Sequence, residues 1–307
     1  MAKGKFSIPI KRNETMKMTA GKFDKPNKWQ DPSNGMHLWP RSIESFSPID
    51  KFSKKYIFDH YSPKKPIFNK QDKIITIGSC FAERLRRWLD AYQKNTEYID
   101  VAEGLSNTHA LRQYFEWVIL KKINADSFNY EEDQLIENER EEVLKELKKT
   151  KGFVITLGLS EIWRNKKDKK VFWRGVPDNL FDPEIHESVV SSVEENTLNL
   201  QSMISTINKY LGKKHIIITL SPVPLNATFQ SRPAIISDCV SKSILRVSIE
   251  NIFKDNIYKN VYYWPSFEMV RWAGSHIPFA TLYEDNTTRH VNNKIVSLII
   301  DNFVKSF

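Results

Sequence analysis

Ser79 stands where one hydrophobic pattern gives way to another. The β-branched run Lys73–Gly78 precedes it, and apolar side chains follow it at every third or fourth position from Phe81 to Leu89. This change of spacing predicts a strand, a tight turn and a helix. Free N–H groups and the dipole at the start of a helix stabilise negative charge. The position therefore suits a nucleophilic hydroxyl, and it equally suits a bound phosphate.

Cys80 follows Ser79 directly and is the second candidate nucleophile. A helix start lowers the pKa of a thiol and so favours the reactive thiolate. The alternative is that Cys80 packs as a small apolar side chain, which is the commoner state of an unpaired cysteine.

The elements that must position these residues follow from the remaining apolar runs. Glu97–Ala102 alternates as a strand, Gly152–Leu157 and His215–Leu220 are apolar enough for central strands buried on both faces, and Val261–Trp264 is the last strand. Helices are predicted over residues 108–122, 131–149, 187–211, 238–254 and 291–304. Between residues 164 and 182 the pattern fails, and we expect a small hairpin over the cleft. Strand and helix alternate five times, which predicts a three-layer α/β/α fold with a five-stranded parallel sheet in the flavodoxin-like order 2-1-3-4-5.

Polar residues follow the ends of several of these strands. They are Ser79, Gly104, Asn107, Ser160 and Pro222. In such sheets ligands bind beyond the carboxyl ends of the strands, at the switch point beside the first strand. We therefore expect these residues to meet in one crevice.

The segment Gly78-Ser79-Cys80-Phe81-Ala82 resembles the signature of the bacterial GSCFA family, which is itself similar to SGNH-type serine hydrolases. Other segments resemble the same family in the expected order, and together they cover roughly residues 73 to 295. These segments are Thr156–Trp163, Ser221–Leu225, Ser241–Arg246, Trp264–Glu268 and Arg289–Val291. The resemblance implies an SGNH-like fold and a serine nucleophile at Ser79.

A serine needs a base, and histidine is the usual one at neutral pH. The chain has seven histidines, and the resemblance implies His290, which precedes the last predicted helix. A surface histidine that caps this helix is the alternative. SGNH-type enzymes carry an acid three residues before the base, where this chain has Thr287. Asp285 is then the predicted third member of the triad, and a backbone carbonyl is the alternative.

Donors for the oxyanion are expected from the same crevice. The candidates are the Ser79 and Gly104 N–H groups, the Asn107 side chain and Ser160. The resemblance implies an asparagine in the third block of the pattern, but this chain departs from it with Gly158-Leu159-Ser160-Glu161.

Glu161 has two interpretations. It acts as a second acid or base, or it pairs with Arg84 or Arg164, and we favour the pairing. The aromatic residues Trp163, Trp173 and Trp264 either stack on a sugar ring or pack in the core.

Length and composition limit the domain organisation, the cofactors and the cellular location that the sequence can support. The 307 residues, 40% of them apolar, predict a domain over residues 71–307 and an extended N-terminal segment, residues 1–70, that wraps it with its first ~20 residues mobile. Two cysteines without metal-type spacing argue against a disulfide scaffold and a metal site, and no cofactor is expected. Since no stretch has the ~18 apolar residues of a membrane span, we expect a cytoplasmic protein.

The chain is basic, with a net charge of +9. Its lysines are scattered at predicted helix ends and turns among acidic residues, so solvated surface explains them better than a nucleic-acid partner. The most consistent function is a serine-dependent ester hydrolase or O-acyltransferase acting on an acylated carbohydrate. The alternatives are a non-catalytic carbohydrate-binding or assembly protein on the same fold, and then a nucleic-acid-binding protein.

Overall fold

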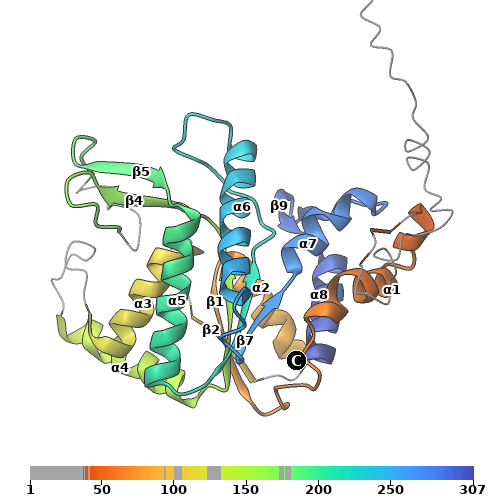
Figure 1. Ribbon diagram of the computed structural model, residues 1–307, viewed down its shortest axis with the longest axis horizontal. Coiled ribbons are helices and arrows are strands. Elements are labelled where there is room, and N and C mark those ends of the chain that lie inside the picture. Colours follow the sequence, from red (N-terminus) through yellow and green to blue (C-terminus); the bar gives the residue numbers. More distant parts are fainter. Residues whose placement is uncertain are drawn as a thin grey trace, which may run out of the picture.

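A central β-sheet forms the middle layer of the molecule, between two layers of helices (Figure 1). The structure, a computed structural model, describes residues 37, 39–40, 42–92, 95–99, 106–122, 133–172, 176 and 181–307. Five parallel strands pair in the order β2-β1-β3-β6-β7. Their bounds are β1 Lys73–Gly78, β2 Asn95–Ile99, β3 Gly152–Leu157, β6 His215–Leu220 and β7 Val261–Trp264. Counted within the sheet this is 2-1-3-4-5, so the predicted fold class and strand order are confirmed.

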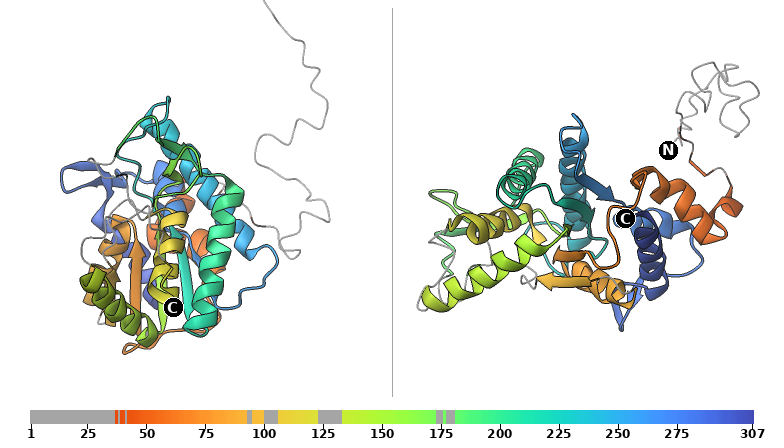
Figure 2. Two further views of the ribbon diagram at one scale, coloured as in Figure 1. Left: turned by 90° about the vertical axis from the view of Figure 1, so that its left-hand side faces the viewer. Right: turned by 90° about the horizontal axis from the view of Figure 1, so that it is seen from below.

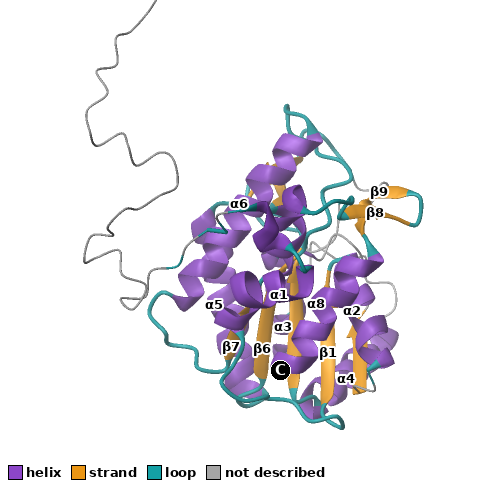
Figure 3. Ribbon diagram, turned by 90° about the vertical axis from the view of Figure 1, so that its right-hand side faces the viewer, coloured by secondary structure: helices purple, strands orange, loops and turns teal. Residues whose placement is uncertain are grey.

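Helices cover both faces because successive residues of each strand point to opposite sides. Ile75 and Ile77 pack under one group of helices, whereas Ile74 packs under the other. The first group is α3 Thr108–Leu120, α4 Asp133–Lys149, α5 Val193–Tyr210 and α6 Ala234–Phe253. The second face carries α2 Cys80–Ala91, α7 Ser266–Arg271 and α8 Asn293–Ser306, and Figure 3 looks onto α2 and α8. The apolar runs of β1, β3 and β6 are therefore buried on both sides.

The described part of the N-terminal segment, residues 42–70, packs beside α8, as the orange and blue parts of Figures 1 and 2 show. The expected extended chain is wrong for residues 43–61, which form short helical turns that include α1 Ile49–Ser53. Burial explains the difference, because turns bring Phe46, Phe52 and Phe58 into the core. Phe58 stacks on Trp264 with ring centroids 4.5 Å apart. The segment that was predicted to be mobile lies outside the described residues.

Two hairpins lie just before helices. Strand β4 Glu161–Asn165 pairs with β5 His186–Val190, and β8 Leu282–Glu284 pairs with β9 Thr287–Val291, both antiparallel. Strand β5 replaces the start of the predicted helix 187–211, and β9 ends at Val291, the first residue of the predicted helix 291–304. Helix α5 begins later than predicted because Ser192 and Glu195 form a capping box. Helix α8 begins later because the Asn292 side chain caps it. Within the described part of the chain, no helix is long and apolar enough to cross a membrane.

Candidate active site

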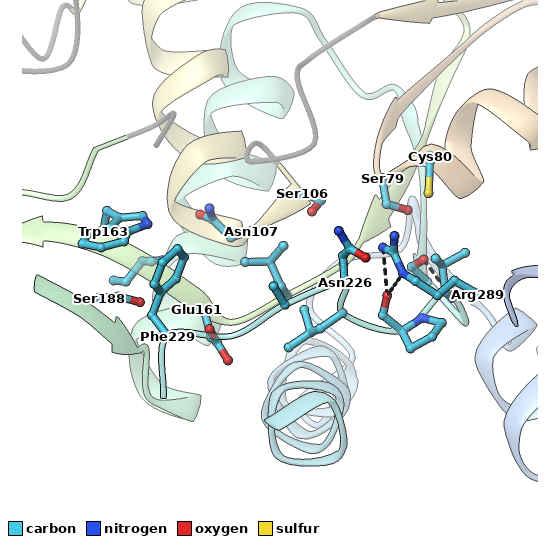
Figure 4. A pocket seen from close by; sticks show the side chains of 18 of the residues that line it. Ser79, Cys80, Ser106, Asn107, Glu161, Trp163, Ser188, Asn226, Phe229 and Arg289 are labelled. Carbon is cyan, nitrogen blue, oxygen red and sulfur yellow. Dashed lines mark hydrogen bonds between the residues drawn. The ribbon is translucent and has the colours of Figure 1, made fainter. Parts of the chain in front are cut away.

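A cavity of about 290 Å³ opens at the carboxyl ends of the strands (Figure 4). The loops after β1, β3 and β6 line it together with the start of α3 and residues of β4, β5 and β9. Ser79 and Arg289 lie toward one end, whereas Trp163, Phe229 and Ser188 lie toward the other. This is the predicted edge of the sheet.

Ser79 reaches the cavity through an unusual turn. Gly78 has φ +123°, and a Cβ on it would lie 2.1 Å from the Thr156 carbonyl oxygen, so this position requires glycine. Ser79 is then the N-cap of α2, but its side chain makes no cap hydrogen bond. Its Oγ is buried and has no hydrogen-bond partner among the described residues. Its N–H donates to the Thr156 carbonyl at 3.2 Å. The hydroxyl is therefore uncommitted at a helix N-terminus.

Asn107 lines the same cavity at the start of α3. Its Oδ1 accepts a hydrogen bond from the Ala110 N–H at 2.8 Å, which caps the helix and fixes the side chain. The amide nitrogen is the donor end of this side chain. Gly104, the other predicted donor on this loop, lies outside the described residues.

The predicted base and acid come together, but away from the cavity wall. His290 Nδ1 lies 3.5 Å from Asp285 Oδ2, at ion-pair distance without hydrogen-bond geometry. Strand β9 alternates, and Arg289 lines the cavity, whereas His290 is not among the lining residues. The Arg289 guanidinium donates to the Pro224 carbonyl at 3.2 and 3.1 Å. The structure thus brings Arg289 to the cavity that holds Ser79.

Ser160 lies behind the cavity wall. It is fully buried, its N–H donates to Ser241 Oγ at 2.7 Å, and its Oγ lies 3.2 Å from the same oxygen. Its carbonyl accepts from the Ser191 N–H and hydroxyl, both at 2.8 Å. These bonds anchor the loop after β3, and they engage the groups that Ser160 would offer an oxyanion.

Glu161 lines the cavity and is buried. The predicted pairing with Arg84 or Arg164 is wrong, because Arg84 donates to Asn293 and Arg164 to Glu187. Glu161 instead accepts a hydrogen bond from Thr228 Oγ1 at 2.7 Å.

The three tryptophans considered from the sequence have different outcomes. Trp163 lines the cavity with its ring edge-to-face against Phe229, at a centroid distance of 4.9 Å. Trp264 is a core residue, packed between Phe58 and the C-terminal helix. Trp173 lies outside the described residues. Cys80, which forms no disulfide, also lines the cavity.

Sequence reasoning missed a buried cluster beneath the cavity. Lys242 on α6 is 2% exposed, and its Nζ donates to the Gly158 carbonyl. Nζ lies 3.9 Å from Asp238 Oδ1, and Asp238 Oδ2 accepts from Arg271 at 2.9 Å. Burial lowers the pKa of Lys242 to about 8. The available signal was a lysine on the buried side of α6 with an acid four positions before it.

Three comparisons with known proteins bear on this site. The model of the GSCFA family matches residues 73–303. No curated protein matches the chain. Among solved structures, the chain is similar to a GDSL-like lipase from Bacteroides thetaiotaomicron at 12% sequence identity and a TM-score of 0.41. That alignment covers 86% of this chain and 96% of the other.

Proposed function

The chain belongs to the GSCFA family, and from this premise and its cavity we propose that it is a serine-dependent ester hydrolase or O-acyltransferase. One observation carries the proposal. The Ser79 hydroxyl is buried in a cavity at a helix N-terminus and makes no hydrogen bond with any residue in the described part of the chain. A serine that only capped the helix would use this oxygen.

The proposed reaction has two steps. Ser79 Oγ attacks the acyl carbon and gives its proton to His290, and the alcohol leaves with that proton as the acyl-enzyme forms. Water or a second hydroxyl then takes the acyl group. Asp285 orients the imidazole, and His290 must turn toward Ser79 when substrate binds, since catalytic contacts tighten in the bound state. Of the oxyanion donors expected from the sequence, Asn107 lines the cavity and is the one we retain, whereas the Ser79 N–H and both donors of Ser160 are engaged within the protein. Gly104 stays a sequence-based proposal.

The lining supports an acylated carbohydrate as substrate. Trp163 and Phe229 offer aromatic surface at one end, and Asn107 and Glu161 offer polar groups between that end and Ser79. A few placed polar groups among apolar ones fix the orientation of a polyhydroxylated ligand. The sugar would then lie against Trp163 with its ester directed to Ser79.

The test is the hydrolysis of p-nitrophenyl acetate and of an O-acetylated glucosamine by wild type and Ser79→Ala. We expect wild-type turnover and a loss of at least about 10³-fold in the variant, because the nucleophile is gone. Ser188→Ala is the matched control, since it removes a hydroxyl from the far end of the same cavity. Turnover that persists in Ser79→Ala, or is abolished only in Ser188→Ala, would contradict the proposal.

One observation favours a second candidate function. His290 does not line the cavity, and without a base the site would bind a carbohydrate and leave it intact. In that case Trp163 fluorescence responds to acetylated sugars, the response is lost in Trp163→Ala, and the wild type shows no turnover.

A further inference from the structure

The loop after β3 has one unused backbone donor. The Gly158 N–H donates to the Ser106 carbonyl at 2.7 Å, and the Ser160 N–H donates to Ser241 Oγ at 2.7 Å. Between them, the Leu159 N–H makes no hydrogen bond with any residue that the structure describes. Buried or semi-buried N–H groups are nearly always paired. An unpaired one in a cavity wall is therefore available to a ligand.

The orientation of this N–H follows from Lys242. The Gly158 carbonyl accepts from the buried Lys242 ammonium, which lies behind the cavity. The Gly158–Leu159 peptide is trans, so its N–H points away from its carbonyl. Both residues line the cavity. The Leu159 N–H therefore points from the lysine side of the peptide toward the cavity side.

Ser79 is close to this peptide. A Cβ built on Gly158 would lie 3.5 Å from the Ser79 Cβ. The Ser79 N–H is already engaged with the Thr156 carbonyl. An oxyanion formed at Ser79 consequently needs donors from neighbouring loops, and the unpaired N–H next to Gly158 is one of them.

We propose that the Leu159 N–H is an oxyanion donor of the site and that Lys242 is the positioning residue that holds its peptide in place. This inference rests on the proposed function, because an oxyanion forms only if Ser79 attacks an acyl carbon. When Oγ bonds to the acyl carbon, the carbonyl π electron pair moves to the oxygen, and this oxyanion accepts a hydrogen bond from the Leu159 N–H. When the alcohol leaves, the pair returns and the carbonyl forms again. The backbone donor takes the place of the asparagine that the chain lacks in this loop.

The charges around Lys242 make this arrangement pH-dependent. Asp238 on its own helix favours the ammonium, whereas Arg271 from α7 and Arg289 from β9 disfavour it; the Cys80 thiol of α2 faces it as well. Burial is the largest effect and lowers the pKa of Lys242 to about 8. Once the ammonium is neutral, its donation to the Gly158 carbonyl weakens. The peptide then holds its orientation less firmly.

The direct test replaces Leu159 with its α-hydroxy acid analogue, which turns the 158–159 amide into an ester and removes the N–H. We expect kcat on p-nitrophenyl acetate to fall about 10²-fold with KM within about threefold, the pattern of a lost oxyanion donor. Stability should change little because the Leu159 N–H makes no hydrogen bond with the described residues. If wild type turns over and the ester variant keeps kcat within about twofold, the inference fails while the proposed function stands.

Lys242 is tested separately, because the ester carbonyl also accepts more weakly. Lys242→Met should lower kcat about tenfold or more with little change in KM, and Lys242→Arg should restore most of the loss. Lys209→Met, at an exposed position of α5, is the matched control. The kcat of wild type should fall as the pH rises through about 8. In Lys242→Arg this fall should shift to higher pH, because the arginine does not deprotonate. A fall that stays at the same pH in Lys242→Arg would overturn the positioning role.

Should Lys242→Met fail to fold, Lys242→Arg and the ester variant still decide the matter. A wild type without turnover would instead remove the proposed function itself.

Discussion

At the scale of single residues, Ser79 differs from the other polar side chains that stand at the N-caps of the described α-helices. Asn107, Ser192 and Asn292 each accept a hydrogen bond from the first turn of their helix, and Ser79 does not. A cap hydrogen bond contributes roughly 1 kcal/mol. Ser79 therefore occupies a capping position without contributing that stability, as expected of a residue retained for its reactivity.

This difference is measurable. Ser79→Ala should change the free energy of unfolding by less than about 0.5 kcal/mol, whereas Ser192→Ala should lower it by about 1 kcal/mol because it removes a capping box. Urea denaturation of the two variants beside wild type makes the comparison. Equal destabilisation would mean that Ser79 has a structural role instead.

His109 carries a second residue-scale prediction. It is buried in α3, its Nε2 has no hydrogen-bond partner, and burial lowers its pKa to about 4. Between pH 6.5 and 4 the unfolded chain then binds a proton that the folded protein does not, so stability falls on acidification by up to about 3 kcal/mol. The difference in unfolding free energy between wild type and His109→Gln should shrink by that amount from pH 7 to pH 4. A constant difference would contradict the assignment.

At the scale of elements, the β8–β9 hairpin decides which side chain faces the cavity. Asp285 and Asn286 have φ of 53° and 58°, the backbone of a two-residue type I′ turn. Asparagine and aspartate tolerate this region better than other side chains. Beyond the turn, strand alternation sends Arg289 and His290 to opposite sides. Asp285 is thus a turn residue as well as the acid proposed for the triad.

The two roles of Asp285 can be separated with Asp285→Asn. Asparagine suits the left-handed turn, so the melting temperature should stay within about 2 °C. If the carboxylate orients His290, kcat should fall at least about tenfold. An unchanged kcat would leave the triad with two members.

Sequence patterns predicted the elements that are long and regular. The apolar runs of β3 and β6 are easily recognised in the sequence because both faces of these strands are buried. The predicted order of the strands then follows from right-handed crossovers. A hairpin was predicted between residues 164 and 182, but its strands β4 and β5 lie at and beyond the ends of that range, and the β8–β9 hairpin was not predicted. Strands of three to five residues carry too little periodicity to be placed from the sequence. The capping residues Ser192 and Asn292 marked the true helix starts.

At the scale of the whole molecule, the site depends on contacts between distant segments. Ser79 and Asn107 could be expected to share a crevice because each was predicted to follow a strand end. Lys242 could not, since its link to Gly158 spans 84 positions and depends on how α6 packs. Arg289 could not either, because strand alternation beyond an unpredicted turn determines its side.

The described part of the N-terminal segment contributes side chains to the core of the domain. Phe58 is 1% exposed and stacks on Trp264 of the last sheet strand, whereas Tyr56 nearby is 37% exposed. Phe58→Ala should lower the free energy of unfolding by about 3 kcal/mol or more through the cavity it leaves. Tyr56→Ala should cost less than about 1 kcal/mol. Similar small losses in both variants would mean that this segment is not part of the folding unit.

The most direct test of the central claim is covalent labelling by a fluorophosphonate with the adduct located by mass spectrometry. An activated serine displaces fluoride and keeps the phosphonyl group on its oxygen. We expect one adduct per chain, on Ser79, and none in the folded Ser79→Ala variant. A folded wild type that takes up no label, or takes it up on another serine, would contradict the account.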